Sequence, residues 1–217
     1  MYKEIVARGL RARETRRQAE ARMVYVVKEV LETTATLREE MNEALRGMLG
    51  ALHTVDEMAL MFRTDADLKE FLRYAVRHGY TLFNSDSDTV TTGPLRSSYD
   101  VAYWFLAAPG YPQLENSYRL ELMTLHTPGS PLHDTLQLWL DNNNHPSVAV
   151  HASFKCHNEE EYANAVHTLG RNGYELTQRC ESTYGRFSYW QPQEAADHPV
   201  NTVYLKPRVN LRDAEEA

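Results

Sequence analysis

Between residues 27 and 52, hydrophobic side chains recur every three or four positions, which is the period of one face of an α-helix. The preceding stretch, residues 2–22, is rich in Arg, Glu and Ala and is also predicted to be helical. Gly47 and Gly50 favour an end of the helix near residue 50. The pattern therefore predicts an N-terminal helical arm over residues 1–52. The apolar stripe consists of Val27, Val30, Leu31, Thr34, Leu37, Met41, Ala44, Leu45, Met48 and Leu52.

A strand pattern begins near Val55, where Met58, Leu60 and Phe62 alternate with Glu57, Ala59 and Met61. A predicted helix follows, with Thr64 or Asp65 as its N-cap and Gly79 as its C-terminal stop. The polar residues 85–97 are then expected to form a loop between strands. This order, strand–helix–strand–strand–strand, defines a first βαβββ module over residues 53–140. Its later strands are predicted at Thr81–Asn84, Tyr99–Leu106 and Tyr118–Leu125.

The same order recurs in a second module over residues 147–207, after a linker-like run at residues 141–146. Its first strand, Val148–Cys156, alternates, and its helix is expected to begin after Asn158 and to stop at Gly173. Residues 208–217 are expected to form a disordered tail. The remaining strands are predicted at Leu176–Cys180, Tyr184–Trp190 and Asn201–Lys206.

Short matches support a duplication of one unit. Arg77-His-Gly-Tyr80 matches Arg171-Asn-Gly-Tyr174, and Tyr99-Asp-Val-Ala-Tyr-Trp104 resembles Tyr184-Gly-Arg-Phe-Ser-Tyr-Trp190 with one inserted residue. The order of predicted elements agrees as well. We therefore predict an α+β fold, in which two tandem βαβββ modules form a curved mixed sheet around a cup, preceded by a long helix.

Charge narrows the partners. The formal net charge of the 217-residue chain is -7, which argues against a general nucleic-acid binder, because phosphate contacts require clustered Lys and Arg. The first 22 residues are instead basic, so this start of the helix could touch an acidic partner or nucleic acid, or could simply be a solvated helix face. No run of about 20 apolar residues predicts a membrane span.

Cysteine usage points to a reducing compartment. Cys156 and Cys180 are the two cysteines of the chain, and they form no CxxC or metal-type spacing. Two buried free thiols are expected rather than a disulfide. The N-terminus also lacks the apolar core of a signal peptide. These features predict a cytoplasmic protein.

The second module resembles the vicinal-oxygen-chelate superfamily of glyoxalase I, bleomycin-resistance proteins and extradiol dioxygenases. The resemblance rests on His151-Ala-Ser-Phe-Lys-Cys156, an acidic helix start, and Leu169-Gly-Arg-Asn-Gly-Tyr174. It extends over residues 53–207 and implies metal ligands on the first and last strands of each module. Those four positions map to Glu57, Glu121, His151 and Tyr204. Glu57 stands where a His is usual in the family, and Tyr204 stands where a Glu is usual.

This resemblance implies a small-ligand-binding or metal-dependent protein that uses the cup. Glu57, Glu121 and His151 would hold Fe(II), Mn(II) or Zn(II), and the two carboxylates, Glu57 and Glu121, would be the catalytic groups that move a proton. His53 is a candidate ligand if the register of the first strand differs. Tyr204, Lys155 and Arg119 would orient an anionic or oxygen-rich ligand.

Two other interpretations remain open at this point. The cup could hold a small molecule without any metal, as an apolar or aromatic pocket. The chain could also be a non-catalytic interaction protein with an eroded metal site. In that case residues 1–52 would bind a protein partner or a second copy of the chain as a dimer.

Overall fold

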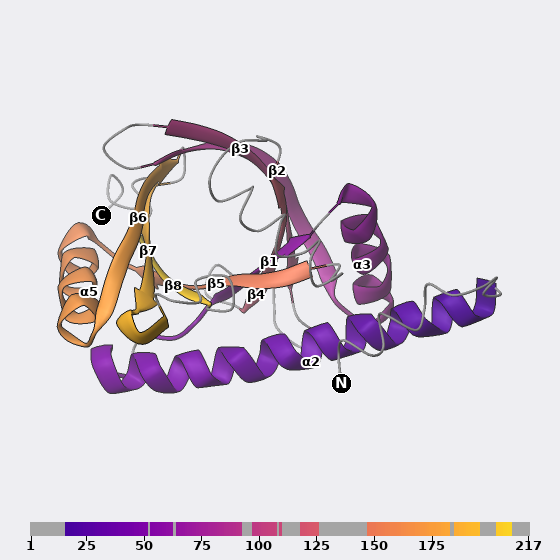
Figure 1. Ribbon diagram of the computed structural model, residues 1–217, viewed down its shortest axis with the longest axis horizontal. Coiled ribbons are helices and arrows are strands. Elements are labelled where there is room, and N and C mark those ends of the chain that lie inside the picture. The colour runs from indigo at the N-terminus through magenta and orange to yellow at the C-terminus, as the bar shows by residue number, and fades with distance from the viewer. Residues whose placement is uncertain are drawn as a thin grey trace.

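The computed structural model describes residues 16–51, 53–62, 64–92, 97–107, 109, 118–125, 147–182, 185–195 and 203–209. Within these ranges, helices lie outside a single curved sheet (Figure 1). The helices are α2 (Arg16–Leu49), α3 (Asp65–Arg77) and α5 (Glu159–Arg171), with a short 3-10 helix at Gln193–Ala195. The strands are β1 (Glu57–Phe62), β2 (Thr81–Thr92), β3 (Ser97–Ala107), β4 (Arg119–Leu125), β5 (Ser147–Cys156), β6 (Tyr174–Ser182), β7 (Gly185–Pro192) and β8 (Tyr204–Val209).

The sheet closes on itself in the order β1-β4-β3-β2-β6-β7-β8-β5. Each module contributes four consecutive strands of this ring, and the modules join at two places. Along one join β1 and β5 are antiparallel over most of their length, whereas along the other only the tips of β2 and β6 pair. The predicted α+β fold of two βαβββ modules around a cup is confirmed.

The two modules share details of local geometry, which supports the duplication. Thr64 caps α3 and Asn158 caps α5, each accepting a hydrogen bond from the backbone N–H three residues later. Gly79 and Gly173 then follow the helices with φ of 89° and 78°, a left-handed conformation that glycine adopts without a Cβ clash. The predicted caps and glycine stops are confirmed.

Matching β-bulges strengthen this conclusion. The pairing of β2 with β3 shifts register between Leu82 and Asn84, and the pairing of β6 with β7 shifts between Leu176 and Gln178. Leu82 follows Gly79 at the same distance as Leu176 follows Gly173. Because a bulge adds local twist and bends its strand, both modules curve at the same point.

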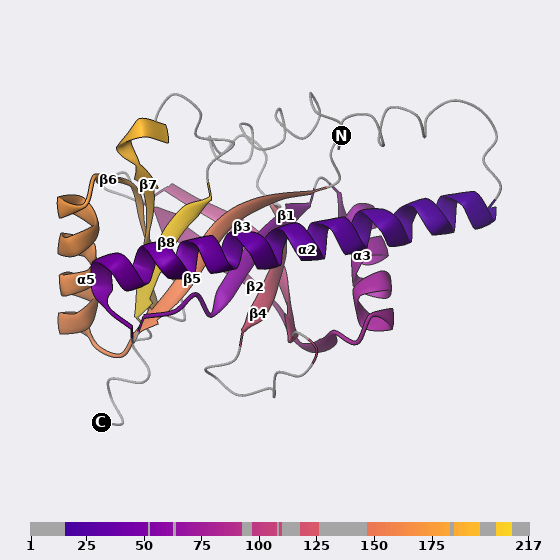
Figure 2. The same ribbon diagram turned by 90° about the horizontal axis from the view of Figure 1, so that it is seen from below.

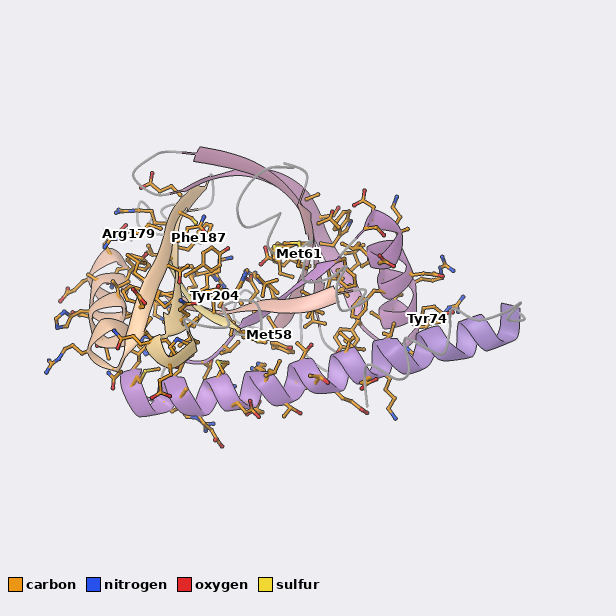
Figure 3. All side chains as sticks on the ribbon, viewed as in Figure 1. Met58, Met61, Tyr74, Arg179, Phe187 and Tyr204 are labelled. Carbon is orange, nitrogen blue, oxygen red and sulfur yellow. The ribbon has the colours of Figure 1, made fainter. Side chains whose placement is uncertain are left out.

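Alternation along β1 builds an outer and an inner layer. Met58, Leu60 and Phe62 belong to the apolar core that also contains residues of the three helices, while Ala59 and Met61 belong to a second buried cluster. Figure 3 shows Met58 on the side of α2 and Met61 inside the curved sheet. The predicted strand register is confirmed, and it places Glu57 on the inner face.

Helix α2 runs along the outside of the barrel, past α5 at one end and α3 at the other (Figures 1 and 2). Its predicted apolar stripe faces the sheet, with Val27 and Leu45 fully buried in the outer core. The helix therefore packs on its own domain. Partner binding or self-association through residues 1–52 stays a prediction. None of the helices in the described ranges is long and apolar enough to cross a membrane.

Two polar side chains of α2 fix the chain just before β1. The Asn42 Oδ1 accepts a hydrogen bond from the Val55 backbone N–H at 2.7 Å, and Arg38 Nε donates to the Val55 carbonyl at 2.9 Å. Arg38 also lies over the ring of Tyr118, 4.2 Å from its centroid. Val55 precedes Glu57 by two residues, so α2 helps to set the position of Glu57.

Some predicted boundaries were wrong. Strand β2 continues to Thr92 and β3 begins at Ser97, where a loop over residues 85–97 was expected, because each polar residue of this hairpin has a cross-strand partner. Strand β8 extends to Val209, so Arg208 and Val209 belong to the sheet rather than to the tail. Their pairing with Lys155 and Cys156 outweighs the strand-ending tendency of Pro207. The remaining tail residues and the linker at 141–146 lie outside the described residues.

We expect Asn42→Ala to lower the free energy of unfolding by about 1–3 kcal/mol, because the variant leaves the Val55 N–H without its hydrogen-bond acceptor. Urea denaturation of both proteins measures this difference. Glu43→Ala is the matched control on the same helix, since Glu43 is exposed and its loss is expected to change stability by less than about 0.5 kcal/mol. Equal effects of the two substitutions would contradict the clamp.

Both cysteines are free and buried, as predicted, and they lie on different sides of the sheet. Cys156 belongs to the outer core and Cys180 to the inner cluster. Burial, and then the nearby Glu161 carboxylate, raise the pKa of Cys156 to about 12. We expect Cys156 to resist alkylation by iodoacetamide at pH 8 in the folded protein and to react in denaturant, because the thiolate is the reactive form. Peptide mapping by mass spectrometry separates Cys156 from Cys180, and rapid labelling of native Cys156 would contradict this expectation.

Candidate metal centre

Four adjacent strands in the middle of the sheet, β4-β1-β5-β8, carry the polar side chains of the cup. Strand β1 pairs with β4 in parallel and with β5 in antiparallel orientation, and β5 pairs with β8 in parallel. The central strands of both modules thus run side by side. Residues far apart in sequence meet there, on the inner face, as the resemblance implied.

Glu57, Glu121 and His151 form a buried cluster, and one ligand atom of each lies within 4.8 Å of the others. The His151 Nε2 is 3.0 Å from Glu121 Oε2 and 3.5 Å from Glu57 Oε1. Two metal ligands at about 2.1 Å from a common ion are separated by about 3.0–3.4 Å when they subtend 90–110°. The spacing and the donor types suit one divalent cation.

A β-bulge helps to aim the histidine. The pairing of β1 with β5 passes from Ala59↔His151 to Leu60↔Ala149, so Val150 is an extra residue on β5. Val150 is buried in the inner cluster beside His151 rather than pointing outward. Bulges of this kind occur next to functional sites, where they redirect side chains. A strict alternation of residues, as read from the sequence, does not reveal it.

Lys206 is the member of the cluster that the sequence interpretation missed. Its Nζ lies 3.2 Å from His151 Nε2, 3.6 Å from Glu57 Oε1 and 3.7 Å from Glu121 Oε2. The side chain is buried and crosses the ring of Phe187, with Nζ 4.6 Å from the centroid. The signal was available, because Lys206 is two residues from Tyr204 and therefore on the same face of a strand.

The mapping of Tyr204 onto the fourth ligand position was wrong by two residues. Glu57 pairs with Arg119 in the first module, and His151 pairs with Tyr204 in the second. Glu57 and His151 have the same spacing as the two helix-stop glycines, so they are equivalent positions of the two modules. Tyr204 is therefore the counterpart of Arg119. Lys206 is the counterpart of Glu121.

Arg119 is bound to Glu57 rather than free to hold a ligand. Its Nε and Nη2 donate to Glu57 Oε2 at 2.8 and 2.7 Å. Burial would raise the pKa of Glu57, but Arg119, followed by Lys206, holds the pKa well below its ordinary value. Glu57 is therefore a permanently charged carboxylate, and its Oε1 has no hydrogen-bond partner within the described residues.

A second ion pair holds β8 against its neighbours. Arg208 donates to Asp56 and to Ser153 Oγ, and Ser153 Oγ donates to the backbone carbonyl of Lys206 at 3.2 Å. Burial raises the pKa of Asp56, with Arg208 opposing that rise. These contacts fix the backbone of Lys206 and the start of β1. They support the cluster without touching it.

Aromatic and apolar side chains surround the polar centre. The rings of His151 and Tyr189 have centroids 5.4 Å apart, and Tyr189 meets Tyr204 edge-on at 6.2 Å. Figure 3 shows Phe187 and Tyr204 turned toward the enclosed side of the sheet. The inner apolar cluster adds Ala59, Met61, Met123, Val150, Cys180 and Phe187.

The structure places the other candidates elsewhere. Lys155 stands near the end of β5, four residues and about 13 Å of strand from His151, and is not brought into the cluster. Its predicted role in ligand binding stays a prediction. His53 was considered in case the strand register differed, but it pairs with Glu161 of α5 at 2.9 Å and touches Phe154 of the outer core. His53 is therefore outside the cup.

The cluster passes a test for a divalent metal on its donors. Two carboxylates and one imidazole converge, and the unpartnered Glu57 Oε1 points to a missing positively charged partner. Two features oppose a tightly bound metal. The Lys206 ammonium lies among the three donors, and His151 Nδ1 has no hydrogen-bond partner in the described part of the chain. Metal-bound histidines usually donate their second ring N–H to an acceptor.

No protein-family model and no curated protein sequence matches this chain. Among solved structures, it is similar to a methylmalonyl-CoA epimerase with 16% identity and a TM-score of 0.47, over 72% of this chain and 94% of that chain. A structural-genomics protein has 11% identity and a TM-score of 0.49, over 88% and 93% of the respective chains. A hydroxyglutarate synthase from Oryza sativa, in complex with 2-oxoadipate, has 12% identity and a TM-score of 0.40, over 86% and 79%. At these values the likenesses carry no argument about function.

We expect Arg119→Met to lower the free energy of unfolding by about 3–5 kcal/mol at pH 7, because it leaves the Glu57 charge buried with one fewer cation. Because the pKa of Glu57 is lowered in the fold, its contribution to stability is fully present above the unfolded value of about 4.3. That contribution is lost as the pH falls through the lower folded value. The deficit of the variant is therefore largest at neutral pH and narrows in acid.

Denaturant unfolding of both proteins between pH 3.5 and 7 measures this deficit. Arg73→Met is the matched control, because Arg73 forms an exposed pair with Glu70 on α3 that contributes at most about 1 kcal/mol. A deficit that stays constant with pH would show that Arg119 does not act through the charge of Glu57.

Proposed function

We propose that this chain is a metal-dependent protein of vicinal-oxygen-chelate type that binds a small, oxygen-rich ligand in the cup. Glu57, Glu121 and His151 would hold one divalent cation of the Fe(II), Mn(II) or Zn(II) class. The ligand would enter the inner space beside the aromatic wall formed by Phe187, Tyr189 and Tyr204.

One observation carries the proposal: three buried donor atoms from three strands and both modules converge within 4.8 Å. Folding buries charged carboxylates at a substantial cost, and structural need alone does not explain two of them together at the centre of a sheet. The unpartnered Oε1 of Glu57 supports the same proposal, since an anionic atom without a hydrogen-bond donor suits a cation ligand.

The two carboxylates would have different roles. Arg119 keeps Glu57 ionised and oriented, which suits a fixed metal ligand and does not suit a group that exchanges protons near neutral pH. Glu121, at hydrogen-bond distance from His151, is the better candidate for proton transfer. When bound, a divalent cation would supply Lewis-acid polarisation of a ligand oxygen. The apolar inner cluster would exclude water, which strengthens these electrostatic interactions.

We expect purified wild-type protein to bind one Mn(II) per chain in a calorimetric titration, and Glu121→Ala and His151→Ala to bind it at least ~10-fold more weakly. Loss of one of three donors easily exceeds the 1.4 kcal/mol to which a tenfold change corresponds. Circular dichroism of each variant checks that the fold is retained.

Glu160→Ala and His167→Ala are matched controls, since both residues are exposed on α5 and chemically identical to the candidate ligands. Their metal affinity is expected to equal that of the wild type. Unchanged binding in Glu121→Ala and His151→Ala would rule out this centre as the metal site.

A further inference from the structure

The buried cluster already contains a cation. The ammonium of Lys206 lies between 3.2 and 3.7 Å from His151 Nε2, Glu57 Oε1 and Glu121 Oε2, the same three atoms that would bind a metal. An ammonium has three donor hydrogens, and three acceptor atoms surround it here. The nitrogen thus takes up the space on which the donor atoms converge.

The position of this lysine in the fold is also that of a ligand. Lys206 is the counterpart of Glu121, so it occupies the last-strand position of the second module. Three of the four equivalent positions carry donors, and the fourth carries a cation. Ser153 and Arg208 hold the backbone at this point.

Charge balance indicates that the cluster is complete without a metal. The carboxylates of Glu57 and Glu121 are matched by Arg119 and Lys206. A divalent cation added to this set would leave two excess positive charges in a buried place, which is strongly unfavourable. Departure of the Lys206 ammonium from the donors would halve that excess.

A nearby place exists for the displaced ammonium. The Nζ is already 4.6 Å from the ring centroid of Phe187 and 6.0 Å from that of Tyr189. Aromatic faces attract ammonium groups through their negative π-surface. A rotation of the flexible lysine side chain toward these rings would free the three donors.

We propose that Lys206 is a built-in competitor for the metal, whose ammonium occupies the cation position in the metal-free protein and is displaced when a divalent cation binds. This inference rests on the proposed metal site and adds a determinant of its affinity. Lys206 makes the site weak for metal and keeps the empty cluster neutral. Removal of its charge would convert the cup into a tighter metal site.

The test compares Mn(II) affinity and thermal stability of chelator-treated wild-type protein and Lys206→Met. We expect Lys206→Met to bind Mn(II) at least ~10-fold more tightly, because a unit positive charge 3–4 Å from a dication is removed. Without metal, the variant is expected to melt at a lower temperature than the wild type. Saturating Mn(II) is expected to raise its melting temperature more than that of the wild type.

Three further variants make the comparison decisive. Lys206→Gln removes the charge but keeps a donor for the carboxylates, so it tests the same effect if Lys206→Met does not fold, and it is also expected to bind Mn(II) more tightly. Lys206→Arg retains the charge and is expected to bind no more tightly than the wild type. Lys69→Met, an exposed lysine of α3, controls for loss of a remote positive charge and is expected to leave the affinity unchanged.

The outcomes separate the two proposals. Equal Mn(II) affinity in the wild type, Lys206→Met and Lys206→Gln would overturn the competitor role and leave the metal site standing. Absence of Mn(II) binding in all of these proteins would overturn both. Tighter binding in the neutral variants alone would support both.

Discussion

The structure depends on the neutralisation of two carboxylates that lie buried where the modules meet. Glu57 is held by Arg119 on one oxygen, and its other oxygen faces Lys206 and His151. Without these cations the charges would be too costly to bury. The four central strands must therefore stay in a register that brings acid and base together. A single slip along β8 would remove Lys206 from the cluster and turn it to the outer face.

Duplication explains why the charges meet. Glu57 and His151 are equivalent positions, as are Glu121 and Lys206, so the join between β1 and β5 brings two unlike pairs face to face. In each pair one module supplies a carboxylate and the other a nitrogen group. The scaffold is repeated while the chemistry is divided between the halves.

Helix α2 connects this centre with the outside of the barrel. Its apolar stripe covers the outer core, and Asn42 and Arg38 grip both backbone polar groups of Val55. Asp56, the next residue, pairs with Arg208 of β8. The helix, the first strand of one module and the last strand of the other are thus linked by a short series of polar contacts. Stability of the fold and geometry of the cluster are set by the same residues.

The sequence by itself determined the order of elements, the helix caps, the inner face of β1 and three of the four cluster residues, because period, capping residues and strand alternation are local properties. Only the tertiary structure decided which residue completes the cluster. The strand pairing of β8 with β5 selected Lys206 over Tyr204, and the bulge at Val150 set the aim of His151. The length of the β2–β3 hairpin likewise came from cross-strand partners. Register and bulges arise from contacts between distant segments, so no local pattern specifies them.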